Sequence, residues 1–368
     1  MTHPFVTVII PARNEERYVA GCLKRVLSQT YPKKRLEILV VDGRSADGTR
    51  DIVAKEALWA ETNHGTSIRL IDNPNGQRTS AMNIGIRRAK GDCIVRVDAR
   101  AVIAGDYIEK CVDTLIRTGA SNAGGVQRPI TERHAVHERN REITQYAAGI
   151  ALSNAFGIGD ARFRLGGESG FVDTVYLGCF RKEVFQKTGL FDEESAVISE
   201  DADMNQRIRE AGGSVYLNAD ISAYYYPRDT ISGLSRLYFR YGGAKAGLLL
   251  KRGRLTAWRQ FVPPTFFLSS VFMPVLGMAF APFYYLWLFM ISLYLGLDAL
   301  VSLRLGLRHR GEINAPTGLG IPASEIRPGF LALFSRLAVI FPAMHFSWAT
   351  GFLYRLIKRA RPGKYWGY

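Results

Sequence analysis

Three acidic side chains crowd into four consecutive positions of this chain, at Glu200, Asp201 and Asp203. The stretch from Ala202 to Ala211 predicts a helix, and a carboxylate at a helix start often does no more than cap free backbone N–H groups. Capping does not need all three acids, and like charges this close repel one another. Such crowding is usually tolerated where a function or a cation requires it. The cluster is therefore a candidate chemical site.

Three further polar groups follow predicted strands: the run from Ala12 to Glu15, Asp42, and Asp98. If these strands lie parallel in one sheet, their carboxyl ends meet at one edge, where open α/β sheets bind ligands. The plain alternative for Asp42 is that it turns the chain into Gly43. That alternative is disfavoured, because Asp47-Gly48-Thr49 already supplies turn chemistry and leaves Asp42 without a structural need.

The elements that would position these groups alternate between strand and helix over the first half of the chain. Such alternation predicts an α/β fold with a mostly parallel sheet, right-handed crossovers and flanking helices. The predicted strands cover residues 5–10, 36–41, 68–71 and 93–97, and the predicted helices run from Asn14 to about Gln29, from Thr49 onward, and from about Thr79 to Ala89.

The charge of the chain changes sharply along its length. Residues 1–230 carry 31 Lys and Arg against 30 Asp and Glu, whereas residues 231–368 carry 17 against 3, so nearly all of the net charge of +15 lies in the second part. Because these basic residues flank long apolar runs, they indicate attraction to anionic lipid, and no nucleic-acid partner is expected.

A long apolar run predicts a membrane anchor. Between Phe261 and Leu303 the only charged residue is Asp298, and 43 helical residues would span roughly 64 Å, enough to cross a ~30 Å hydrocarbon core twice. A turn near Ala281-Pro282 would make this a tight hairpin. Basic residues at both ends predict that those ends, and the α/β domain before them, lie on the cytoplasmic side of the inner membrane. A buried helical core in a soluble protein is the disfavoured alternative.

A second apolar stretch, at about residues 330–352, contains Arg336 and His345. A re-entrant or interfacial segment is favoured here over a third crossing. The expected organisation is an α/β domain at residues 1–230, an amphipathic interfacial helix and linker at 231–260, a transmembrane hairpin at 261–303, and a basic tail at 304–368.

Several segments together resemble family 2 glycosyltransferases of the GT-A fold. They are VIIPARNE at residues 8–15, VVDGRSADGT at 40–49, Asp98, and SEDADM at 199–204, and their order and spacing match over residues 5–220. Two more segments, RVDARA at 96–101 and GGESGFVD at 166–173, resemble the succinoglycan-type β-glucosyltransferases of bacterial exopolysaccharide assembly.

The resemblance implies a site for a nucleotide sugar. Pro11, Ala12 and Arg13 would line a uridine pocket, and the Asp42 carboxylate would accept a hydrogen bond from the uracil ring. Asp98 would lie by the ribose or the diphosphate. The same resemblance adds three charged residues to the nucleotide-sugar site: Glu15, Arg78 and Arg100.

The resemblance also implies a divalent cation, Mg²⁺ or Mn²⁺, that would neutralise the leaving diphosphate and would be held by Asp98. Here the chain departs from the Asp-x-Asp pattern of the family, because the third position is Arg100. Metal coordination would then use Asp98 with water, phosphate oxygens or another side chain. The alternative for Arg100 is direct contact with phosphate.

For catalysis, the resemblance implies that Asp201 is the general base of an inverting transfer and that Glu200 orients it or the acceptor. Asp173 and Arg240 are candidate contacts to the acceptor or the diphosphate. The expected reaction moves a hexose, with glucose as the first expectation, from a UDP-sugar to a polyprenyl-diphosphate-linked saccharide. A Gln-x-x-Arg-Trp motif of processive synthases is lacking near Arg240, so a single transfer is preferred. The alternative is a catalytically inactive membrane scaffold that binds nucleotide sugar.

Overall fold

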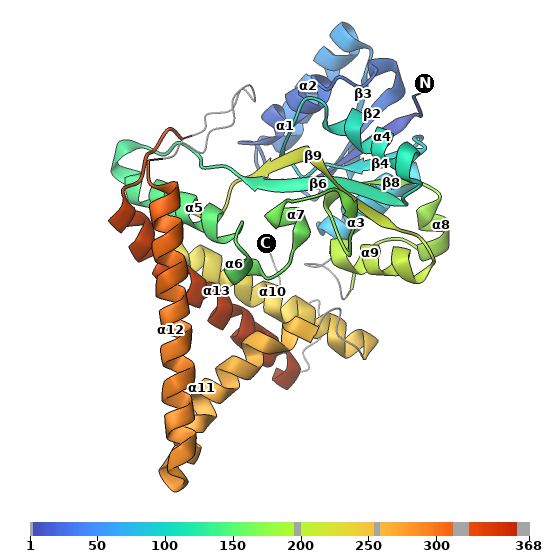
Figure 1. The fold of residues 1–368 in the computed structure, drawn as a ribbon. Helices are drawn as coiled ribbons and strands as arrows, with labels where there is room; N and C mark the ends of the chain where they lie inside the picture. The colour runs from blue at the N-terminus through green and yellow to red at the C-terminus, as the bar shows by residue number, and fades with distance from the viewer. Residues whose placement is uncertain (1–2, 195–199, 254–257, 312–323, 359–368) are drawn as a thin grey trace. The chain divides into compact units, whose positions relative to one another are not determined.

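The computed structural model describes residues 3–194, 200–253, 258–311 and 324–358 (Figure 1). The chain forms two compact units. The first comprises Met1–Arg128 and Arg162–Tyr225, and the second comprises Pro129–Ala161 and Tyr226–Tyr368. The chain therefore passes between the two units at more places than the predicted boundary near residue 230. Residues 129–161 leave the sheet unit and group with the C-terminal helices.

The N-terminal half of the sheet in the first unit is parallel. Its strand order is β3-β2-β1-β4, with β1 paired to β2 and β4, and β2 to β3, all in parallel. Every residue of β2 is buried, as expected for an inner strand covered on both faces. The bounds are β1 Val6–Ala12, β2 Leu36–Asp42, β3 Ser67–Asp72 and β4 Cys93–Arg96, close to the predicted strands.

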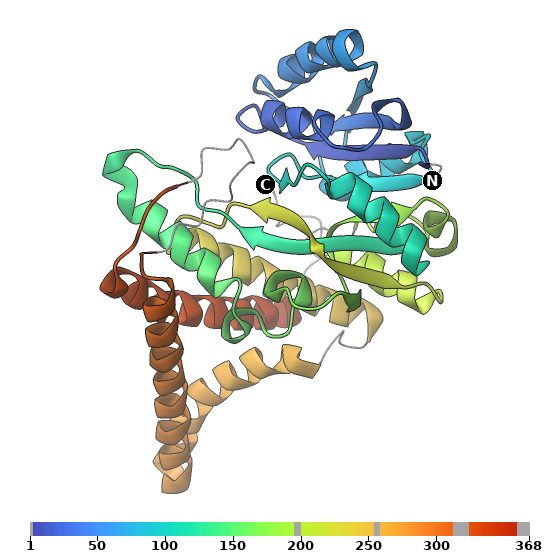
Figure 2. The same cartoon turned by 45° about the horizontal axis from the view of Figure 1, so that its top comes forward.

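The rest of the sheet is antiparallel. Strand β8 runs against β4 and β6, and β9 runs against β5 and β7. The sheet as a whole is thus mixed, and the predicted parallel arrangement holds for its first four strands (Figure 2). The additional strands are β5 Val102–Ile103, β6 Asn122–Pro129, β7 Gly170–Phe171, β8 Tyr176–Arg181 and β9 Val215–Tyr225.

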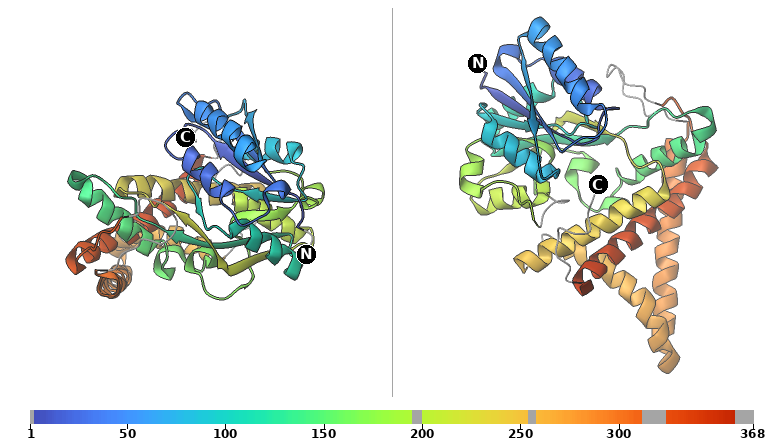
Figure 3. Two further views of the ribbon diagram at one scale, coloured as in Figure 1. Left: turned by 90° about the horizontal axis from the view of Figure 1, so that it is seen from above. Right: turned by 180° about the vertical axis from the view of Figure 1, so that it is seen from behind.

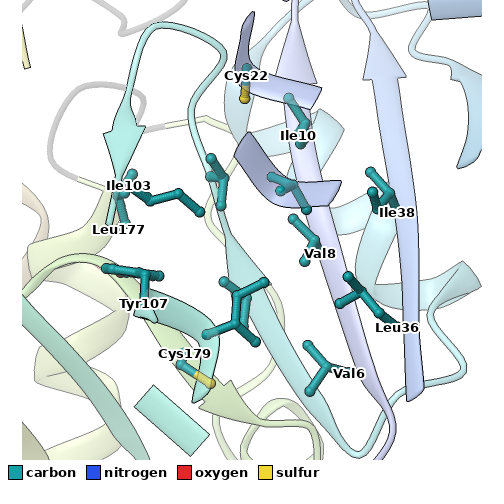
Figure 4. Packing of buried hydrophobic residues seen from close by; sticks show 14 of the residues in the cluster. Val6, Val8, Ile10, Cys22, Leu36, Ile38, Ile103, Tyr107, Leu177 and Cys179 are labelled. Carbon is teal, nitrogen blue, oxygen red and sulfur yellow. The ribbon is translucent and has the colours of Figure 1, made fainter. Parts of the chain in front are cut away.

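Helices cover both faces of this sheet. Side chains alternate along each strand, so each face presents apolar side chains against which helices pack. Val6, Val8 and Ile10 of β1 join one core with α1, α2 and α4, as Figure 4 shows in part, whereas Ile9 joins a second core with α3, α8 and α9. The bounds are α1 Val19–Leu27, α2 Thr49–His64, α3 Arg78–Arg88, α4 Tyr107–Thr118, α7 Arg162–Leu165, α8 Val184–Thr188 and α9 Glu200–Glu210, with a 3₁₀ turn at Lys33–Arg35.

The start of α1 differs from the prediction, which placed it at Asn14. The helix begins at Val19, and Asn14 has a left-handed backbone with φ of 55°. Asn14 adopts this conformation because its backbone N–H donates to Ser45 Oγ at 2.9 Å and its side-chain oxygen accepts from Ala46 N at 2.9 Å. Asparagine tolerates this region better than most residues. Residues 14–18 therefore form a loop at the edge of the sheet.

The second unit is helical. Helix α13 packs against α10, α12, α11 and α5, and Figure 3 shows α10 and α13 side by side. Gly242 and Gly351 permit this close approach, because a Cβ at either position would lie 1.9 Å from a backbone oxygen of the other helix. The bounds are α5 Arg139–Ala151, α6 Ala155–Ile158, α10 Ile231–Arg252, α11 Val262–Ala279, α12 Ala281–His309 and α13 Phe330–Lys358, with 3₁₀ turns at Val136–Glu138 and Trp258–Phe261.

The predicted break between two apolar helices lies at Phe280, whose extended backbone separates α11 from α12 one residue before the predicted Ala281-Pro282 turn. Helices α11, α12 and α13 are each long and apolar enough to cross a membrane. Most apolar side chains of α11 and α12 are exposed, with Met278 at 89%. Helix α13 is one continuous helix of 29 residues.

Candidate active site

The strand ends of the parallel half converge as predicted. Ala12, Asp42 and Asp72 pair in register across β1, β2 and β3, and Arg96 ends β4 two residues before Asp98. The candidate polar groups of the front domain therefore follow one edge of one sheet. This edge lies wholly within the first unit.

Two loops at this edge are tied together by side chains. Glu15 N donates to Thr49 Oγ1 at 2.8 Å, and Gly48 N donates to Glu16 Oε2 at 2.7 Å. With the bonds between Asn14 and residues 45–46, these contacts hold the segment after β1 against the segment after β2. The run from Ala12 to Glu15 is therefore fixed at the sheet edge.

Asp42 has a structural role, contrary to the prediction from the sequence. Its side chain is 0% exposed and accepts hydrogen bonds from Ser45 N, Ser45 Oγ and Arg50 Nη1. The premise that turn chemistry at residues 47–49 leaves Asp42 without a structural need is wrong, because the buried carboxylate itself organises this loop. Asp72, by contrast, is 78% exposed and lies 2.8 Å from the same Arg50 nitrogen.

Arg96 connects three carboxylates of the site, those of Asp98, Glu200 and Asp201. It was not among the site residues predicted from the sequence. It is 1% exposed. Its Nε and Nη2 donate to the two oxygens of Asp98 at 2.8 and 3.2 Å, Nη2 also donates to Glu200 Oε1 at 3.0 Å, and Nη1 donates to Asp201 Oδ1. One signal was present in the sequence: a charged residue inside the apolar run of β4, where an unpaired charge would be costly.

Arg78 is the second cation among these acids. It begins α3, its Nη1 lies 3.2 Å from Glu200 Oε1 and 4.0 Å from Asp98 Oδ2, and its side chain is 39% exposed. Burial would raise the pKa of Asp98, but the guanidinium groups of Arg96 and Arg78 outweigh it and lower that pKa. Asp98 is therefore ionised, with an exposed cation beside it.

Asp201 is more exposed than Glu200, and its pKa is raised. Burial, together with the charges of Glu200 and Asp98, raises the pKa of Asp201 to about 7 against the opposing effect of Arg96 and Arg78. Its side chain keeps 28% exposure, whereas that of Glu200 has 3%. Of the three acids in the first turn of α9, Asp201 is the one that a substrate can reach, because Asp203 is 2% exposed. Its pKa suits a general base that works near neutral pH.

Arg100 occupies the position where an Asp-x-Asp pattern has its second acid. Its Nε lies 2.8 and 3.0 Å from the two oxygens of Glu15, and its guanidinium lies 5.2 Å from the ring centre of Tyr18. Burial raises the pKa of Glu15 against the effect of Arg100. The Arg100 side chain remains 55% exposed, so it can reach a bound anion.

The remaining predicted residues lie in different places. Pro11 is in β1, and Arg13 is exposed at the sheet edge, with Nη1 3.5 Å from Gly76 O. Asp173 is exposed beside Thr174, whose Oγ1 accepts from Asn205 Nδ2 at 2.9 Å. Asn205 is one helical turn after Asp201, so Asp173 is held near the start of α9. Arg240 lies on α10 in the second unit.

For a divalent cation, Asp98 is the candidate carboxylate at the sheet edge. In the described parts of the chain, no group of three or more His, Cys, Asp or Glu side chains could hold a metal ion. Asp98 is ionised and its side chain is 22% exposed, and each oxygen keeps a lone pair beyond its bond to Arg96. Mg²⁺ commonly takes one or two carboxylates and completes its shell with substrate phosphates and water. Asp98 fits a cation held in that way.

Known proteins resemble this chain in sequence. Residues 7–189 match the family described as Glycosyl transferase family 2. The chain is 28% identical over 254 residues, 68% of this chain and 75% of the other, to the dolichyl N-acetyl-alpha-D-glucosaminyl phosphate 3-beta-D-2,3-diacetamido-2,3-dideoxy-beta-D-glucuronosyltransferase of Methanococcus voltae. It is 26% identical over 258 residues, 70% of this chain and 73% of the other, to the succinoglycan biosynthesis protein ExoA of Rhizobium meliloti (strain 1021).

One solved structure shares the fold over almost the whole chain. It is that of the mannosyltransferase PcManGT from Pyrobaculum calidifontis in complex with GDP-Man and Mn²⁺. The likeness has a TM-score of 0.57 at 19% sequence identity and covers 98% of this chain and 89% of that one.

Proposed function

We propose that this chain, which belongs to glycosyl transferase family 2 through residues 7–189, is an inverting hexosyltransferase. It would move one hexose from a UDP-sugar to a lipid-linked saccharide, with inversion at the anomeric carbon. The expected family, the GT-A fold and the transferase activity are confirmed by the family match, the curated relatives and the shared fold. Those relatives act in polysaccharide or glycolipid biosynthesis. The sugar, the acceptor and the side of the membrane belong to the proposal.

One observation supports the mechanism above all others. Asp201 is an accessible carboxylate at the start of α9 whose pKa is raised to about 7, and a buried guanidinium holds one of its oxygens. A carboxylate with that pKa can take a proton from an alcohol as the alcohol oxygen becomes a nucleophile. Glu200 is almost fully buried between Arg96 and Arg78, which suits an orienting role better than contact with substrate.

The proposed transfer is a single displacement. The acceptor oxygen forms a bond to the anomeric carbon on the face opposite the diphosphate, while the bond from that carbon to the diphosphate oxygen breaks and its electron pair leaves with the nucleoside diphosphate. Asp201 receives the proton of the acceptor hydroxyl. Arg78 and Arg100, which are partly exposed, would stabilise the charge that develops on the leaving group.

The donor site would use the same sheet edge. Pro11, Ala12 and Arg13 would line the nucleoside pocket, and Glu15 would orient Arg100. Because Asp42 is fully enclosed, it would shape this pocket through its bonds to Ser45 and Arg50. Asp98 would hold a divalent cation, Mg²⁺ or Mn²⁺, which when bound neutralises the diphosphate. The mannosyltransferase with the same fold was solved with GDP-Man and Mn²⁺.

The acceptor is proposed from the membrane anchor and the relatives. The Methanococcus voltae relative is named for transfer to a dolichyl-phosphate-linked sugar, and the Rhizobium meliloti relative is a succinoglycan biosynthesis protein. Three apolar helices could anchor this chain in a membrane. A polyprenyl-diphosphate-linked saccharide confined to the cytoplasmic face of the bilayer fits both observations, with Asp173 and Arg240 as candidate contacts.

The first test is an assay of the purified, detergent-solubilised chain with a panel of UDP- and GDP-sugars, with and without Mg²⁺ or Mn²⁺ and with a membrane lipid extract. The expected result is release of nucleoside diphosphate from one UDP-hexose. Asp201→Asn should lower kcat by at least about 10³-fold, because the general base is lost, while the affinity for the donor stays nearly unchanged.

Glu210→Gln is the matched control, because Glu210 is an exposed acid at the other end of the same helix. It should keep wild-type turnover. Near-normal turnover of Asp201→Asn would refute the assigned base, and UDP binding without any turnover in the wild type would favour the inactive scaffold that binds nucleotide sugar.

A further inference from the structure

Arg96 is a cation enclosed in the sheet with three carboxylates around it. Four hydrogen bonds leave its guanidinium, two to Asp98, one to Glu200 and one to Asp201. The planar fork of arginine can serve several acids in fixed directions at once, which the ammonium group of lysine cannot. This geometry exceeds what neutralising one buried acid would need.

Arg96 also joins two parts of the chain that are distant in sequence. Asp98 follows β4, whereas α9 begins more than a hundred residues later at Glu200. Among the described residues, the hydrogen bond that connects the side chain of Asp201 to the rest of the sheet edge comes from Arg96. The direction of the Asp201 carboxylate is therefore set from the strand that carries Asp98.

The two oxygens of Asp201 are not equivalent. Oδ1 accepts from Arg96 Nη1, and Oδ2 accepts no hydrogen bond from any residue that the structure describes. With 28% of the side chain exposed, Oδ2 is the oxygen that an acceptor hydroxyl can approach. Catalytic groups need placement of this kind, since a displacement of about 1 Å can lower a rate about 100-fold.

We propose that Arg96 is a positioning residue for the transfer reaction: it holds Oδ1 of Asp201 so that Oδ2 faces the acceptor hydroxyl, and through Asp98 it keeps that oxygen in register with the donor diphosphate. The inference rests on the proposed role of Asp201 as the base. Arg96 itself does not contact substrate in this mechanism, because it is enclosed by the three carboxylates.

The test compares Arg96→Lys with the wild type in steady-state transfer and in direct binding of UDP. Lysine keeps the charge but loses the fork, so kcat should fall by about 100-fold while the donor KM and the UDP affinity change by less than about threefold. Arg181→Lys is the matched control, because Arg181 ends the neighbouring strand β8 and its side chain donates to two backbone carbonyls, Ala120 O and Leu115 O. It should keep the wild-type kcat.

Two results would overturn the inference. One is a kcat of Arg96→Lys within about twofold of the wild type. The other is a parallel loss of kcat, UDP affinity and melting temperature, which would indicate a purely structural role. If Arg96→Lys does not fold, Arg96→Gln combined with Glu200→Gln removes a cation and an acid together, and its kcat is compared with that of Glu200→Gln alone.

The inference and the proposed function fail in different ways. If the wild type transfers sugar and Asp201→Asn does not, but Arg96→Lys is fully active, only the positioning role is refuted. If Asp201→Asn is as active as the wild type, the base is wrong and the positioning role falls with it.

Discussion

At the scale of single residues, two arginines hold acids at the sheet edge with different consequences. Arg96 is enclosed and binds Asp98, Glu200 and Asp201. Arg50 is 41% exposed and joins the buried Asp42 to the exposed Asp72. In the mechanism that we propose, the first arrangement directs a reactive group, whereas the second stabilises a loop.

The raised pKa of Asp201 predicts how turnover depends on pH. Below about pH 7 the folded protein keeps a proton on Asp201, and above it the carboxylate is free to act as a base. We therefore expect kcat to rise about tenfold per pH unit below the pKa and to level off above it. Transfer rates between about pH 5 and pH 9 at saturating donor check this, and a rate that is flat across the acidic half of the range would contradict it.

The contrast between Asp42 and Asp72 predicts a difference in stability. Asp42→Ala should lower the free energy of unfolding by about 1–3 kcal/mol, because it leaves buried donors of the Ser45 loop without their acceptor. Asp72→Ala removes an exposed ion pair with the same arginine and should change it by less than about 1 kcal/mol. Denaturant unfolding of both variants measures the difference. An equal loss of unfolding free energy in both would show that the burial of Asp42 does not determine its contribution to stability.

At the scale of elements, the packing of α10 on α13 depends on residues without side chains. A Cβ on Gly351 would lie 1.9 Å from Phe239 O of α10, so the two backbones must separate to admit even one methyl group. This close approach is the reason that the long apolar α13 is partly covered, whereas α11 and α12 expose most of their apolar surface.

Gly351→Ala should therefore lower the melting temperature of the detergent-solubilised protein by several degrees, since a Cβ at that distance from backbone forces the helices apart. Gly296→Ala is the control, because Gly296 lies within α12 with no atom within 4 Å of its ideal Cβ. Alanine favours a helix there, so the control should be neutral or slightly stabilising. A neutral Gly351→Ala would show that α10 and α13 do not pack this closely.

At the scale of the whole molecule, the sheet unit carries the chemistry and the helical unit carries the apolar surface. The change in charge near residue 230 lies close to the last boundary between the two units, at residues 225–226. Residues 129–161 belong to the helical unit, so the chain passes between the units more than once.

The proposed orientation can be tested with single cysteines, because the four native cysteines are all buried. Met278→Cys, at an 89% exposed position near the turn of the α11–α12 hairpin, should react with an impermeant thiol reagent from the outside of intact cells. Leu58→Cys, at a 70% exposed position on α2, is the control and should react only in inverted vesicles. Labelling of both from the same side would refute the orientation.

The sequence alone was sufficient for whatever depends on local pattern. Periodicity and apolar runs predicted β1 to β4, the break beside Pro282, and the convergence of Asp42 and Asp98 on one sheet edge, because the alternation of strands and helices restricts where the carboxyl ends of parallel strands can lie. The acid cluster at Glu200 and Asp201 was likewise visible as crowded charge.

Only the tertiary structure decided which side chains are enclosed and what they touch. The burial of Asp42 beneath Ser45, the four bonds of Arg96 and the grouping of residues 129–161 with the C-terminal helices all join segments distant along the chain or depend on loop closure. No periodicity records such contacts, because they arise when separate elements pack. The late start of α1 has the same cause, since bonds from residues 45–49 outweigh the local helical tendency of residues 14–18.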